Sequence, residues 1–173
     1  AKNVGETTLS TTLVYGDYKI STIEHLLSAL AGTGVDNCII DCDGPEIPIM
    51  DGSSTQFVFL IQTAGIVEQN AVKKFVYVTK SVQVQRDDAV ARINPYDGFR
   101  VTFTLEFDHP VYNKYPHSAS IDFSQTSFIR EVSRARTFGL MDDLEKLKKM
   151  DLALGANLNN AIGIGDEDVL NEG

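Results

Sequence analysis

The strongest structural signal in the chain is the stretch Ser21-Thr-Ile-Glu-His-Leu-Leu-Ser-Ala-Leu-Ala-Gly-Thr-Gly34. Its first four residues have the spacing of a capping box, in which a serine and a glutamate three positions later satisfy free backbone N–H groups. Apolar residues then recur at helical spacing, at Ile23, Leu26, Leu27 and Leu30. Gly32 and Gly34 end the pattern. The stretch therefore predicts a helix with one apolar face turned toward a core.

Strand and helix patterns continue on both sides of this helix. Pro45 and Pro48 exclude regular structure from residues 44–52, which we expect to form an ordered loop. The expected strands are Thr7–Val14, Tyr18–Ile20, Val35–Asp43, Phe75–Gln85, Ala89–Ile93, Arg100–Phe107 and Ala119–Phe123. The other expected helices are residues 54–64, Gln125–Ala135 and Met141–Met150, followed by short pieces at Leu152–Leu158 and Ala161–Ile164. The change to strand-rich sequence near residue 70 predicts two lobes, residues 1–70 and 71–173, each with strands and helices.

Composition excludes several classes of function. The chain has 173 residues, with 15 Lys and Arg against 24 Asp and Glu, a net charge of −9 that disfavours nucleic acid as a partner. Its longest purely apolar run, Phe57–Ile61, is far shorter than the roughly 20 residues of a membrane-spanning helix, and no signal peptide is visible. Cys38 and Cys42 are expected to be buried free thiols of a cytosolic protein. The absence of an initiator Met and the turn-like end at Asn171-Glu-Gly173 predict a fragment of a longer protein.

Glu24 and His25 lie on the expected polar face of the first helix, opposite its apolar arc. Two interpretations stay open. Glu24 closes the capping box and His25 is a solvated first-turn residue, or the pair is a general base beside a metal ligand. One histidine cannot make a metal site. The two remaining histidines, His109 and His117, lie beside prolines in a polar region and are expected to be solvated loop residues.

Two acidic or glycine-rich stretches give weak signals. Asp41, Asp43, Glu46 and Asp51 lack the ligand spacing of a calcium-binding loop, and Asp51-Gly-Ser-Ser54 is more simply a turn that leads into a helix. Gly163-Ile-Gly165 lacks the third glycine and the helix of a dinucleotide-binding loop.

The segment Ser133-Arg-Ala-Arg-Thr-Phe-Gly139 also has two interpretations. As structure, it is the end of a helix, with cations near the negative end of the dipole and Gly139 as the cap. As function, Thr137 presents a hydroxyl donor to a developing oxyanion, with an arginine nearby for an anionic substrate. The sequence pattern alone favours the structural interpretation.

Three motifs carry a resemblance to a known family. They are residues 21–37, from Ser21 to Asn37; Gly44-Pro-Glu-Ile-Pro-Ile-Met-Asp-Gly-Ser-Ser54; and Ser133–Gly139. They closely resemble the UDP-3-O-acyl-N-acetylglucosamine deacetylases of bacterial lipid A synthesis, and the similarity runs along the whole chain. The resemblance implies an α+β fold, an α/β sandwich of two lobes whose helices face each other, with the second lobe truncated here.

The resemblance also implies an activity. In that family a zinc ion held by two His and one Asp activates water, which removes the acetyl group from the glucosamine nitrogen. By resemblance, His25 is a zinc ligand, Glu24 is the general base, Thr137 stabilises the oxyanion, and Asp143 orients a general-acid histidine. The residues implied to bind substrate, along an apolar passage for the acyl chain, are Phe138, Gly139, Leu140, Leu144, Ala153, Ala156, Ala161 and Gly163; ordinary core packing is the alternative for each.

Members of the family continue beyond the Leu-Asn-Glu-Gly stretch into a segment that carries the other two zinc ligands and the general-acid histidine. We therefore expect the whole protein to be a cytoplasmic, monomeric zinc deacetylase that acts on an acylated UDP-N-acetylglucosamine. Its contact with membranes is expected to be transient, through the lipid product. These 173 residues alone are expected to be inactive, or to bind only the acyl or nucleotide part of the substrate.

Overall fold

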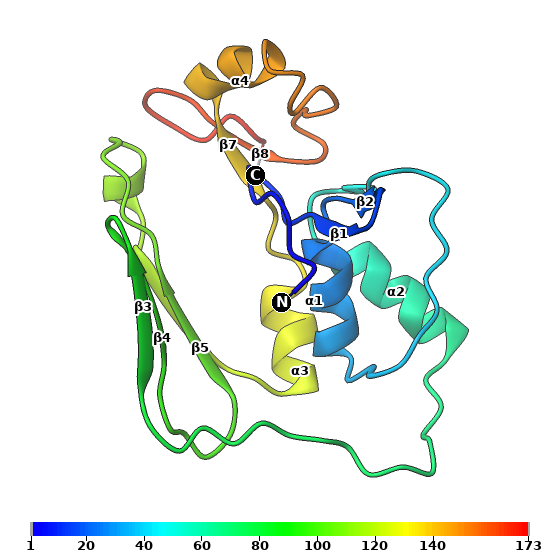
Figure 1. The fold of residues 1–173 in the computed structure, drawn as a ribbon. Coiled ribbons are helices and arrows are strands. Elements are labelled where there is room, and N and C mark those ends of the chain that lie inside the picture. The colour runs from blue at the N-terminus through cyan, green and yellow to red at the C-terminus, as the bar shows by residue number, and fades with distance from the viewer. Residues whose placement is uncertain (1, 173) are drawn as a thin grey trace.

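The computed structural model describes residues 2–172, without the side chains of residues 125 and 145. Three helical segments from distant parts of the sequence lie close together on one side of the molecule, and two long hairpins stand on the other side (Figure 1). The helices are α1 (Glu24–Gly32), α2 (Thr55–Ala64), α3 (Gln125–Ser127), which continues as the π-helical turn η2 (Phe128–Val132), and α4 (Met141–Lys148). A short 3₁₀ turn, η1, spans Tyr112–Lys114.

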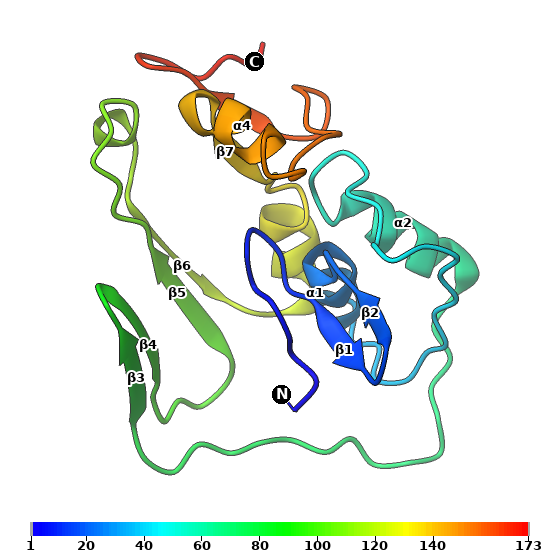
Figure 2. The ribbon, with the colours of Figure 1, turned by 45° about the horizontal axis from the view of Figure 1, so that its top comes forward.

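The strands form four two-stranded sheets. Three are antiparallel hairpins: β1 (Leu13–Tyr15) with β2 (Tyr18–Ile20), β3 (Val82–Arg86) with β4 (Ala89–Ile93), and β5 (Arg100–Thr104) with β6 (Ser118–Asp122). The fourth pairs β7 (Phe138–Leu140) with β8 (Ile162–Ile164) in parallel. The mixture of helices and small sheets is compatible with the α+β class. In the turned view, α4 and β7 lie on the far side of the molecule from the N-terminal strands (Figure 2).

The structure corrects four of the expected strands. Val35–Asp43 runs without strand pairing, and only Val82–Gln85 of the expected strand Phe75–Gln85 joins a ladder. The expected strands Thr7–Val14 and Arg100–Phe107 are shorter, as β1 and β5. A strand needs partners for its backbone N–H and C=O groups, and Val35–Asp43 and Phe75–Ser81 have no strand partner among residues 2–172. Cys38 and Cys42 are free thiols, but both are exposed, so the expected burial is wrong.

The predicted helix at Ser21–Gly34 is present as α1, but the capping box is wrong. The N-cap residue is Ile23, with no side-chain cap bond. Ser21 instead pairs with the loop at residues 44–52: its backbone N–H donates a hydrogen bond to Pro45 O at 2.9 Å. The Glu24 carboxylate accepts a hydrogen bond from the backbone N–H of Thr11 rather than capping its own helix. At the other end, the Thr33 hydroxyl donates to Ala29 O at 2.8 Å.

The buried core joins α1, α2 and η2. Its buried apolar members are Ile23, Ala29, Ile47, Phe57, Val58 and Phe128. Phe128 is 2% exposed and lies against Gly32, where an added Cβ would stand 2.1 Å from the ring. Only glycine therefore allows this close approach of α1 and η2. Leu27, expected in the buried arc, is 47% exposed.

No helix in the described part of the chain has both the length and the apolar character needed to cross a membrane. The longest of those described, α2, has ten residues.

Candidate functional site

The loop formed by residues 44–54 fixes the start of α1. Ile47 N–H donates to Ser21 O at 3.0 Å, and the Thr22 hydroxyl donates to Glu46 Oε1 at 2.6 Å. These bonds hold Ser21 and Thr22, the two residues before the N-cap of α1. They hold the first turn, which carries Glu24 and His25, against the loop, and both of these side chains are half-buried.

The other end of the same loop binds the segment that carries Thr137. Thr137 N–H donates to Gly52 O at 2.8 Å, and Ser54 N–H donates to Ser133 O at 3.1 Å. Gly52 is buried and has a φ of +84°, a conformation that favours glycine. The loop therefore connects two segments more than 100 positions apart in the sequence, the residues just before α1 and the residues just before β7.

Arg136 reinforces this connection. Its Nε donates to Asp51 O at 2.7 Å and its Nη2 donates to Leu158 O at 3.2 Å. The guanidinium is thus committed to two backbone carbonyls, which favours the structural interpretation of this arginine over the binding of an anionic substrate. Its role was not visible in the sequence, because the two carbonyls come from distant segments.

The expected helix end at Ser133–Gly139 is partly wrong. The helical turn ends at Val132, with Ser133 as its C-cap. Thr137 O accepts a hydrogen bond from Ile162 N–H at 2.8 Å, and the next three residues form β7. Gly139 is therefore a strand residue rather than a cap, with open space where a side chain would stand. The half-buried Thr137 lies directly before this strand.

Asp143 lies in α4. In Figures 1 and 2, β7 lies between this helix and α1. The Asp143 carboxylate accepts a hydrogen bond from Lys146 Nζ at 2.8 Å, and this bond raises the pKa of Lys146. The Asp143 side chain is 48% exposed.

The residues implied to line an acyl passage lie around β7 and β8. The strand register places Gly139 beside Gly163 and Leu140 beside Ile164. Gly163 is buried, and an added Cβ there would meet Leu158 Cδ2 at 2.8 Å. The space beside Gly163 is therefore filled by side chains. Half-buried positions among the implied passage residues are Leu140, Leu144, Ala153, Ala156 and Ala161, whereas Phe138 and Gly139 are exposed.

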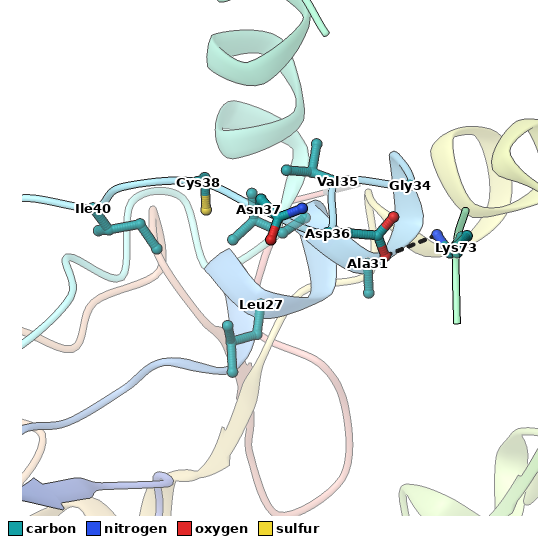
Figure 3. Close-up of a pocket in the computed structure, with 10 residues that line it drawn as sticks. Leu27, Ala31, Gly34, Val35, Asp36, Asn37, Cys38, Ile40 and Lys73 are labelled. Atoms are coloured by element: carbon teal, nitrogen blue, oxygen red, sulfur yellow. Dashed lines mark ion pairs between the residues drawn. The ribbon is translucent and has the colours of Figure 1, made fainter. Parts of the chain in front are cut away.

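Two grooves are present elsewhere. The larger, about 690 Å³, lies between the second half of α1 and the extended segment 34–40, with Leu27 and Ile40 on its walls (Figure 3). Lys73 pairs with Asp36 at its edge, at 3.0 Å. The second, about 450 Å³, is lined by α2 residues and Met50. None of the implied passage residues lines either groove.

The histidines, cysteines and acidic residues do not form a metal site in the described part of the chain. Among residues 2–172, no group of three His, Cys, Asp or Glu side chains is arranged to hold a metal ion. His25 alone therefore does not fit a catalytic zinc site, which needs three protein ligands. In the acidic stretch that was weighed as a calcium-binding loop, Asp51 Oδ1 accepts a hydrogen bond from the Ser53 hydroxyl at 2.8 Å, within the turn that leads into α2.

His109 is not the fully solvated residue that the sequence predicted. It is half-buried, its Nδ1 accepts the Val111 N–H at 3.3 Å, and its ring lies 6.1 Å from the ring of Tyr112. The ring of Tyr112 contacts those of Phe107 and Phe138. Sequence reasoning missed this cluster because its members are separated by up to 31 positions and follow no common period. His117 is exposed, as predicted.

Comparison with known proteins identifies the family. The family model described as "LpxC: UDP-3-O-acyl N-acetylglycosamine deacetylase" matches residues 1–173. A UDP-3-O-acyl-N-acetylglucosamine deacetylase of Methylococcus capsulatus is 58% identical over 170 residues, which cover 98% of this chain and 56% of that protein. Proteins of the same name from Hahella chejuensis and Thioalkalivibrio sulfidiphilus are 57% and 55% identical, over 99% and 98% of this chain and 57% and 56% of their own lengths. The chain thus spans a little over half the length of these relatives, and it belongs to the UDP-3-O-acyl-N-acetylglucosamine deacetylase family.

Proposed function

We propose that these residues form part of a longer, cytoplasmic and monomeric hydrolase. The hydrolase removes the N-acetyl group from UDP-3-O-(3-hydroxyacyl)-N-acetylglucosamine and releases acetate in lipid A biosynthesis. The names of the relatives support the reaction and the substrate class. The observation that carries the proposal is the loop at residues 44–54, which is hydrogen-bonded both to Ser21, shortly before Glu24 and His25, and to Thr137, directly before β7.

Glu24 acts as the general base in this proposal. Its carboxylate removes a proton from the water that attacks the acetyl carbonyl. One of its oxygens accepts the Thr11 N–H, and an ionised carboxylate has about four lone-pair positions, so capacity for the water is left. The tetrahedral adduct then collapses with cleavage of its C–N bond. The amine nitrogen takes up a proton from the general-acid histidine and leaves, and the acetyl part leaves as acetate.

Thr137 stabilises the charge that develops in this step. Its hydroxyl donates a hydrogen bond to the carbonyl oxygen as that oxygen becomes negative. The bonds from Thr137 N–H to Gly52 O and from Ile162 N–H to Thr137 O fix its backbone on both sides. A donor held in place before the reaction needs no reorganisation when charge appears.

His25 would supply one ligand of a zinc ion, and the other ligands would come from outside residues 2–172, because no three-ligand group is present within them. A zinc ion held there would supply Lewis-acid polarisation and would lower the pKa of a water molecule beside it. We also propose that the 173 residues are inactive alone. Asp143 orients the general-acid histidine. The implied substrate-binding residues between Phe138 and Gly163, around β7 and β8, bind the acyl chain. Because side chains fill the space beside Gly163, those side chains move apart when the acyl chain binds.

Replacing Thr137 with valine in the full-length protein should lower kcat for acetate release by about 10²–10³-fold, since one oxyanion donor is lost. Valine keeps the methyl group that faces Gly52, so the backbone arrangement should persist. Thr137→Ser retains the hydroxyl and should keep kcat within about tenfold of the original protein. Equal rates for the valine and serine variants would contradict the oxyanion role.

A further inference from the structure

The segment at residues 105–117 reaches across from β5 to the β7–β8 pair. It leaves the hairpin at the end of β5, makes the turn η1, and returns into β6. Lys114 Nζ donates to Glu167 O in the loop after β8, so the turn is attached to that loop. The two segments lie next to each other in both ribbon views, the turn in light green and the loop in red (Figures 1 and 2). Val111, 2% exposed, is buried beside the turn.

Three aromatic rings make the second attachment. The Tyr112 ring centroid lies 4.7 Å from that of Phe107 and 6.0 Å from that of Phe138, and Phe107 and Phe138 are 6.1 Å apart. These separations lie in the range of favourable aromatic pairs, and both contacts with Phe138 are edge-on. Phe138 is 40% exposed and follows Thr137 directly, so its ring needs support from outside its own short strand.

The Tyr112 hydroxyl does not explain why a tyrosine is held there. It is buried and has no hydrogen-bond partner among the residues that the structure describes. Burial raises the pKa of Tyr112, so the group stays protonated. A buried donor without a partner lowers stability, whereas the ring contributes packing against two neighbours. The ring is therefore the part of the side chain that stabilises this contact.

We propose that Tyr112 is a positioning residue, whose ring holds Phe138 and, through the backbone, Thr137 in the place that deacetylation requires. This inference rests on the proposed function, because it assigns Tyr112 an effect on the reaction through Thr137. Tyr112 itself does not touch the reacting atoms. Small displacements of a catalytic group lower rates strongly, so loss of the ring should appear in kcat.

The test compares Tyr112→Leu and Tyr112→Phe in the full-length protein, with kcat and KM for acetate release and the thermal midpoint Tm. Tyr112→Leu should lower kcat about tenfold. Tyr112→Phe keeps the ring and removes the hydroxyl, so kcat should stay within about twofold and Tm should rise by about 2–6 °C. Phe99→Leu is the control, because it removes a ring pair with Phe123 at 5.2 Å that does not include Phe138. It should lower Tm and leave kcat and KM unchanged.

The outcomes separate this inference from the proposed function. If the unmodified protein releases no acetate, the proposed function fails. If it releases acetate and Tyr112→Leu lowers Tm while kcat and KM stay within twofold, Tyr112 is merely structural and the inference is overturned. A loss of kcat in Tyr112→Phe equal to that in Tyr112→Leu also overturns it, since the hydroxyl would then be required. If the leucine variant does not fold, a loss of kcat of more than twofold in Tyr112→Phe, without a fall in Tm, overturns the inference by itself, because the ring is still present.

Discussion

Replacing Glu24 with glutamine in the full-length protein should reduce kcat for acetate release by about 10²–10⁴-fold, the usual contribution of a positioned general base. Glutamine keeps an oxygen that can accept the Thr11 N–H, so the hydrogen bond seen in the structure can persist. It cannot take a proton from water at neutral pH. The expected result is a folded protein with nearly unchanged KM and very low kcat, measured by steady-state kinetics.

Glu46→Gln is the matched control for this variant. Glu46 lies in the loop at residues 44–54, and its carboxylate accepts a hydrogen bond from the hydroxyl of Thr22, just before α1, at 2.6 Å. Its replacement removes the same charge near the same turn without touching the proposed base, so kcat should fall by less than about tenfold. A Glu24→Gln protein that is as active as Glu46→Gln would show that Glu24 only holds the N-terminal segment.

The second large effect is expected at Gly52. Alanine there has a Cβ 2.1 Å from Asn160 O and a φ of +84°, so both backbone strain and a clash with backbone oppose the native loop. We expect a loss of about 2–4 kcal/mol in the free energy of unfolding, or a fall in Tm of about 5–15 °C. Because Gly52 O binds the Thr137 N–H, kcat should fall as well.

Gly44→Ala tests whether this effect belongs to Gly52 or to the loop in general. Gly44 lies in the same loop, has no atom within 4 Å of an added Cβ, and lacks a positive φ. Its replacement should change the free energy of unfolding by no more than about 0.5 kcal/mol. Similar Tm values for the two alanine variants, measured by calorimetry, would contradict the assigned role of Gly52 in joining the two segments.

The sequence predicted local elements well where periodicity alone defines them. The helix expected at residues 54–64 is observed as Thr55–Ala64, and the strand Ala89–Ile93 has the expected bounds. Both depend on short-range patterns, a turn that leads into a helix and a hairpin turn.

The errors arise where tertiary contacts override local signals. Ser21 has the sequence position of a capping residue, but its backbone is bound by Pro45 and Ile47, so its side chain does not cap α1. Gly139 follows a helix at a cap-like distance, but Ile162 N–H pairs with the segment and makes it a strand. No local pattern encodes such long-range pairings.

The candidate site follows the same division. Glu24, His25 and Thr137 were found from the sequence, as residue types suited to hydrolysis and from the family resemblance. Their attachment to a single loop, with Gly52 and Arg136 as its anchors, appears only in three dimensions. Tyr112 was missed, because its contact with Phe138 joins segments that no sequence period relates.

Zinc-dependent deacetylation is tested most directly with the full-length protein and UDP-3-O-(3-hydroxyacyl)-N-acetylglucosamine. The measurement is the number of acetate molecules released for each molecule of this UDP-sugar converted. Acetate is measured before and after removal of metal by a chelator, and again after zinc is returned. We expect one acetate for each molecule of the UDP-sugar converted, loss of acetate release on chelation, and recovery of release when zinc is returned. An absence of acetate in the presence of zinc, or an unchanged rate after complete metal removal, would contradict it.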